Sequence, residues 1–121
     1  KRLSELAILV IARYWCAQFE WYAHAPMAIS AGISAAAVEA IQISEKPLLN
    51  ADDERLVYDF VSELLESRTV SQSTYDQAEA TLGRLGVVDL VGIVGYYCLV
   101  SITLNVFDMP LPNGEAPPLS P

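Results

Sequence analysis

Apolar residues recur along the chain at the spacing of amphipathic helices, and no segment shows the strict alternation of a half-buried strand. The clearest pattern has two i, i+4 rows, formed by Leu56, Phe60, Leu64 and Val57, Val61, Leu65. Asn50 or Asp52 is expected to cap the start of this helix, and the acidic residues 52–54 suit the positive end of its dipole. The pattern therefore predicts an all-α fold.

Proline, glycine and serine mark the other helix boundaries. Residues 3–17 and 18–30 are predicted to form two successive helices, the second bent at Pro26 and ended by Gly32. Ser34 is placed to cap the helix that follows.

A further helix is predicted after residue 70, capped by Ser71 or Ser73 and ending near Gly83. Five of the seven prolines lie in residues 109–121, and proline removes a backbone donor, so no regular structure is expected there. A chain of 121 residues fits one compact domain. We expect one helical domain over residues 1–108 and a proline-rich tail over residues 109–121.

The apolar stretch Gly86–Phe107 is long enough to cross a bilayer and contains one charged residue, Asp89. The same composition suits a helix at the centre of a bundle or in a subunit interface. Ser101, Thr103 and Asn105 add polar groups along the stretch, and no basic flank orients it in a membrane. We therefore predict a core or interface helix rather than a membrane span.

The charge of the chain excludes one large class of partner. The net charge is −8 and the seven basic residues are scattered, so we expect no nucleic-acid binding.

Cys16 and Cys98 lie far apart without metal-ligand spacing, which suits a reducing, cytoplasmic environment. Glu5 and Arg13 interrupt the apolar N-terminal run, and no small-residue cleavage site follows, which argues against a signal peptide.

The segment CAQFEWYAHAP places the only histidine, His24, four residues after Glu20. On a helix these side chains lie one turn apart, so the carboxylate can accept a hydrogen bond from one ring nitrogen. The other nitrogen is then free to give or take a proton near neutral pH. The apolar surroundings come from Trp15, Phe19, Trp21 and Tyr22. The spacing alone leaves open a purely structural pair.

Two stretches, RLSELAILVIARYWCAQFEWYAHAPMAISAGIS and GYYCLVSITLNVFDMPLPNGEAPPL, resemble the carboxymuconolactone decarboxylase family, which includes the AhpD-like alkylhydroperoxidases. The matching positions are Glu5, Glu20, His24, Ala31, Gly32 and Ser34. The resemblance implies an AhpD-like bundle of about five to six helices. Family members usually carry another helical segment before this motif, so we expect such a segment to be missing before Lys1.

The AhpD pattern, E-x11-C-x2-C-x3-H, falls on Glu5, Ala17, Glu20 and His24, so both redox cysteines are absent. Cys16 lies one residue before the first site, which turns its side chain by about 100° on a helix. The resemblance therefore favours the lactone-decarboxylase branch, in which E-x-x-x-H without cysteines is usual. A peroxiredoxin-type redox protein and a non-catalytic helical oligomer stay as alternatives.

The resemblance implies loss of carbon dioxide from a small cyclic carboxylic acid or lactone. No metal or organic cofactor is needed, because the conjugated carbonyl of the substrate holds the electrons. His24 is the expected general acid, oriented by Glu20. Glu5 is either a proton relay or a partner of the helix dipole near Ser4.

Substrate-binding residues follow from the same resemblance. Arg13 is the expected clamp for the substrate carboxylate, or alternatively a solvated or interface ion pair. Trp21, Tyr22 and Tyr97, or its neighbour Tyr96, line the pocket or pack in the core. The apolar C-terminal stretch and the proline-rich tail predict an oligomer in which the tail lies across a neighbouring subunit. The resemblance implies a trimer or hexamer.

Overall fold

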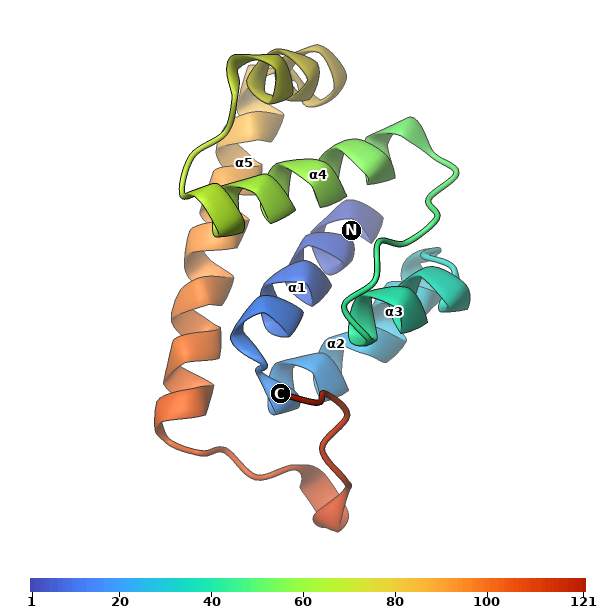
Figure 1. The fold of residues 1–121 in the computed structure, drawn as a ribbon, viewed down its shortest axis with the longest axis vertical. Coiled ribbons are helices and arrows are strands. Elements are labelled where there is room, and N and C mark those ends of the chain that lie inside the picture. Colours follow the sequence, from blue (N-terminus) through green and yellow to red (C-terminus); the bar gives the residue numbers. More distant parts are fainter.

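The computed structural model covers residues 1–121 and confirms the all-α fold, with five α-helices and no strand. Figure 1 shows a bundle in which one long helix runs along the edge. The helices are α1 (Arg2–Trp15), α2 (Gln18–Ala31), α3 (Ala35–Gln42), α4 (Asp52–Ser67) and α5 (Gln72–Val106), followed by a 3-10 turn, η1 (Pro112–Gly114).

Helix α1 is the centre of the bundle and packs against each of the other four helices (Figure 1). Its residues from Glu5 to Ala12 are all buried, so this helix is surrounded on every side. A helix in this position must be apolar all round, which explains the unbroken run LAILVIA after Glu5. Glu5 is the first residue of this buried run, so its carboxyl group is itself buried.

Most of the predicted caps are confirmed. Ser34 Oγ accepts a hydrogen bond from the backbone N–H of Ala37 at 3.1 Å, and Ser71 Oγ caps α5 in the same way. Gly32 ends α2 with φ +116°, a conformation that side chains disfavour.

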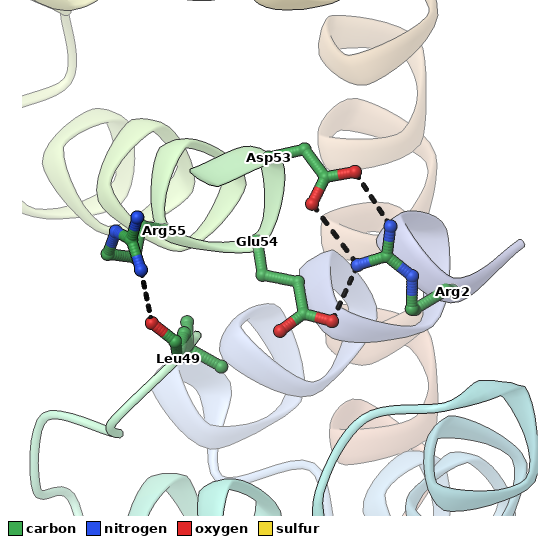
Figure 2. Close-up of polar contacts among 5 residues, drawn as sticks. All are labelled: Arg2, Leu49, Asp53, Glu54 and Arg55. Carbon is green, nitrogen blue, oxygen red and sulfur yellow. Dashed lines mark hydrogen bonds and ion pairs between the residues drawn. The ribbon is translucent and has the colours of Figure 1, made fainter. Parts of the chain in front are cut away.

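The predicted cap of α4 is wrong, because Ala51 occupies the N-cap without a side-chain hydrogen bond. The carboxylate of Asp52 instead pairs with Arg55 one turn later. Arg55 also donates to the backbone oxygen of Leu49 at 2.6 Å (Figure 2). The start of α4 is therefore held by a side-chain network rather than by a cap.

The start of α4 is also fixed to the start of α1 by Arg2 (Figure 2). The Arg2 guanidinium donates to Asp53 Oδ2 at 2.7 Å and to Glu54 Oε2. Hydrogen bonding to these carboxylates raises the pKa of Arg2, and the guanidinium lowers the pKa of Asp53. The acidic residues predicted to serve the helix dipole therefore also bind a cation from another helix.

Helix α5 consists of two segments that meet at Gly83, whose φ of 74° and ψ of 169° are not helical. This agrees with the predicted helix end near Gly83. The sequence predicts that Gly86–Phe107 is a core or interface helix, and 22% of the most apolar window of α5 is buried within the chain, so it is a core helix only in part. Of all the helices, only α5 has the length and apolar composition that a membrane span requires.

The tail returns to its own chain instead of extending away from it. The amide of Gln18 makes two hydrogen bonds with the backbone of Leu119, at 2.7 and 2.8 Å, and Gln42 Nε2 donates to Pro118 at 2.9 Å. Leu119 is 2% exposed. The tail thus lies on α2 and α3 of its own chain, and its only regular element is η1.

Candidate functional site

His24 and Glu5 form a pair between α2 and α1. His24 Nδ1 lies 2.8 Å from Glu5 Oε1, and the two side chains are 18% and 6% exposed. An ionised carboxylate only accepts hydrogen bonds, so Nδ1 carries a hydrogen and donates it. This arrangement leaves Nε2 as the ring nitrogen available for proton transfer.

The hydrogen bond predicted between Glu20 and His24 is not formed. Glu20 is directed at α5, where the hydroxyl of Ser101 donates to Glu20 Oε2. The one-turn spacing placed Glu20 and His24 on the same side of α2, but the neighbouring helices supply each with a closer partner. Glu5, which sequence spacing offered as a relay or a dipole partner, is the residue that holds the imidazole.

Glu20 is a buried carboxyl group with one unpartnered atom. Its side chain is among the fully buried ones, and Oε1 has no hydrogen-bond partner. Burial raises the pKa of Glu20, while the Ser101 hydroxyl and the charge of His24 oppose that rise. Glu20 is therefore protonated more readily than an exposed glutamate.

Tyr97 joins this cluster from α5. Its ring meets the His24 ring edge to face, with centroids 5.6 Å apart and an interplanar angle of 83°. Burial and, secondarily, the negative charge of Glu5 raise the pKa of Tyr97. The phenol thus stays protonated and can donate a hydrogen bond.

A shallow hollow of about 640 Å³ lies beside Tyr97 on α5. Its lining residues are Val88, Asp89, Gly92, Ile93, Tyr96 and Tyr97. A second hollow, of about 250 Å³, is lined by Lys1 and Ser4 among others and shares Asp89 and Ile93 with the first. None of the four principal hollows is lined by His24, so Tyr97 is the link between a hollow and the imidazole.

Arg13 lies apart from His24. It sits eight residues after Glu5, about 12 Å further along α1. Its guanidinium donates to the backbone oxygens of Gln42, at 3.0 Å, and Ser120. These partners are carbonyl groups of its own chain, so the guanidinium is not placed beside His24 as the predicted clamp requires.

The predicted aromatic lining is divided between different environments. Trp21 is 3% exposed and packs in the core, whereas Tyr22 is 37% exposed at the surface. Tyr97 alone contacts His24. The sequence marks Ser101 only as a polar residue in the apolar stretch and not as a site residue. It lies four positions after Tyr97, one helical turn away.

Both cysteines are free. Cys98 accepts a hydrogen bond from Trp15 Nε1 at 3.3 Å, and Cys16 ends α1 in a left-handed conformation with its Sγ 3.5 Å from the amide of Gln18. No group of three or more His, Cys, Asp or Glu side chains is placed to bind a metal ion.

Comparison with known proteins adds no relative. No known protein family, no curated protein and no solved structure matches this chain.

Proposed function

We propose that the chain is a cofactor-independent decarboxylase or related lyase of the carboxymuconolactone decarboxylase type, acting in the cytoplasm on a small cyclic carboxylic acid or lactone. The observation that carries the proposal is the hydrogen bond between His24 Nδ1 and Glu5 Oε1, which leaves Nε2 available. A histidine held in this way is suited to general acid catalysis.

In the proposed reaction the bond between a ring carbon and the substrate carboxylate breaks, and carbon dioxide leaves. The electron pair moves into the conjugated carbonyl group and forms a dienolate. Nε2 of protonated His24 then delivers its proton to carbon, and the ring regains a proton from solvent. Glu5 accepts the hydrogen bond from Nδ1 and holds the ring in place during transfer.

Tyr97 is the proposed donor to the enolate oxygen. Its ring contacts His24, and its raised pKa keeps the hydroxyl protonated at neutral pH. A donor that faces the developing negative charge lowers the energy of the transition state. The buried carboxyl group of Glu20, on the same helix as His24, accepts a hydrogen bond from Ser101 on the same helix as Tyr97.

A cation for the substrate carboxylate must come from a residue other than Arg13, because that guanidinium binds carbonyl groups elsewhere. Lys1 lines the second hollow, which shares Asp89 and Ile93 with the hollow beside Tyr97. We assign the docking role to its side chain.

The test is release of carbon dioxide from a panel of small unsaturated carboxy-lactones and cyclic carboxylic acids. We expect His24→Gln to lower turnover by roughly a hundredfold or more, the usual contribution of a general acid, with little change in KM. Tyr97→Phe should also lower turnover, whereas the matched variant Tyr14→Phe, at a residue 52% exposed, should not. Full activity in His24→Gln would remove His24 from the mechanism, and an inactive wild type would contradict the decarboxylase proposal.

The redox and non-catalytic alternatives make different demands on the chain. A thiol peroxidase cycle needs a resolving cysteine where this chain has Glu20, whose carboxyl group is engaged by Ser101. A purely structural oligomer gives no reason for a half-buried histidine paired with the buried Glu5 on the helix that carries the buried carboxyl group of Glu20. The geometry therefore supports acid–base chemistry better than either alternative.

A further inference from the structure

Helix α5 exposes a continuous apolar stripe that its own chain leaves uncovered. The members recur at alternating steps of three and four residues, the heptad spacing of helices that pack side by side. This outer stripe consists of Leu85, Val88, Gly92, Gly95, Leu99, Ile102 and Val106. Its five branched side chains are between 41% and 81% exposed, although all of them belong to residue types that proteins usually bury.

The opposite face of α5 already packs inside the chain. Val87, Leu90, Val94 and Ser101 are buried there, each two residues after a member of the outer stripe. Two residues turn a helix by about 200°, so the two faces lie nearly back to back. Figure 1 shows the second half of α5 at the edge of the bundle, with no helix on its outer side.

The two glycines at the middle of the outer stripe have no role in the packing of the chain itself. A Cβ added at Gly92 or Gly95 meets no atom within 4 Å. Each glycine costs a helix about 1 kcal/mol relative to alanine. Close approach of another helix backbone would explain the absence of side chains at these two positions.

We propose that the outer stripe of α5 packs against the outer stripe of a second copy of this chain. The chain carries a net charge of −8, and two such copies repel each other at most surfaces. Between Leu85 and Phe107 the only charge is Asp89, which lies outside the stripe. The outer stripe itself carries no charge, and Asp89 only borders it at Val88, so this is the surface on which two acidic copies meet with the least repulsion.

The stripe is also long enough for a stable contact. It extends over about 30 Å of helix. Val91, Tyr96 and Phe107 flank it and are 52%, 59% and 77% exposed. Together these side chains offer an area on the order of the 800 Å² per partner that specific protein interfaces bury.

A bilayer is the other environment that an apolar helix could occupy. The inner face of α5 is held against α1, whereas a spanning helix contacts lipid or other helices within the membrane on all sides. An acidic chain is also repelled by anionic lipid surfaces. These observations favour a second copy over lipid.

The pairing has a consequence for the site. The hollow beside Tyr97 shares Val88 and Gly92 with the outer stripe, so a second copy would enclose it. This consequence rests on the proposed function, whereas the pairing itself does not.

The test measures the mass of the purified chain by sedimentation velocity over a micromolar concentration range. We expect the wild type to sediment as two or more chains and Leu99→Glu as one. Leu48→Glu is the matched control, because Leu48 is 91% exposed in the loop before α4, and it should behave as the wild type.

Gly95→Ala keeps the test valid if Leu99→Glu misfolds, because alanine strengthens the helix of the separate chain. We expect this variant to keep its helical circular dichroism and to associate at least tenfold more weakly, about 1.4 kcal/mol. A wild type that is monomeric throughout, or that floats with phosphatidylcholine and phosphatidylglycerol vesicles as single chains, would overturn the proposal. Association of Leu99→Glu as strong as that of the wild type would do the same.

Discussion

Ser101 on α5 donates a hydrogen bond to the carboxyl group of Glu20 on α2, across the helix interface beside His24. The other carboxyl oxygen, Oε1, is buried and has no partner. A buried carboxylate with an unsatisfied oxygen costs free energy, and protonation relieves that cost. The pKa of Glu20 is raised for this reason.

The first prediction follows from this raised pKa. The folded state binds the Glu20 proton more tightly than the unfolded state, so the free energy of unfolding should fall as pH rises from about 4.3 through the folded pKa. Glu20→Gln removes this titration and still accepts from Ser101. We expect its melting temperature to equal or exceed that of the wild type at neutral pH, with a weaker dependence on pH.

Thermal unfolding between about pH 4 and pH 8 checks this prediction. Glu39→Gln is the control, because Glu39 is exposed on α3, and it should reproduce the wild-type pH dependence. An unchanged slope in Glu20→Gln would show that Glu20 does not titrate abnormally.

The helices and most of their ends could be predicted because the signals are local. Gly32, Ser34 and Ser71 act on the backbone within three or four residues, so their spacing is sufficient evidence. The cap of α4 failed because Asp52 had a competing partner, Arg55, which is also local. Spacing shows which partners are possible but does not show which one is preferred.

The partner of His24 could not be predicted because it depends on how helices pack. Glu20 is one turn away in sequence, yet Glu5, nineteen residues earlier, makes the hydrogen bond. The side of α2 that faces α1 and the side that faces α5 are set by the burial of whole helices. The sequence identified the residues Glu5, Glu20 and His24, but only the fold shows which of them interact.

The second prediction concerns Glu5. Glu5→Gln keeps an oxygen that accepts from His24 Nδ1 but makes this hydrogen bond one between neutral groups, which is weaker than a charge-assisted one. We expect turnover to fall by about tenfold or more, part of the range that acid–base catalysis supplies. Glu5→Ala should fall further, because the ring then loses its acceptor as well.

Steady-state kinetics on the substrate found for the wild type will measure both effects, with Glu39→Gln as the control for loss of one exposed carboxylate. Imidazole nitrogen shifts should show loss of the fixed Nδ1–H form in Glu5→Ala. Wild-type turnover in Glu5→Gln would mean that the charge of Glu5 plays no part in proton transfer.

The third prediction separates acid–base from thiol chemistry. Cys16→Ser and Cys98→Ser should each keep turnover within a few-fold of the wild type, because Cys98 accepts a hydrogen bond from Trp15 and Cys16 accepts one from Gln18, and neither is hydrogen-bonded to His24. Thiol titration with and without peroxide provides an independent readout. Loss of activity in either variant with helicity intact, together with peroxide-dependent loss of thiol, would favour the redox alternative.

The last prediction concerns Arg13, whose position decides between two roles. A guanidinium that docks a substrate carboxylate would raise KM when removed, whereas one that binds the Gln42 and Ser120 carbonyls would act on stability. Arg13→Met keeps most of the apolar stem and leaves these carbonyls without their donor, so the free energy of unfolding should fall by about 1–3 kcal/mol. Arg84→Met is the control, because the Arg84 side chain is 84% exposed, and it should change stability little. Urea unfolding and steady-state kinetics measured on the same preparations distinguish the two roles. Lower stability with unchanged KM is the expected result, and a raised KM with wild-type stability would return Arg13 to the substrate site.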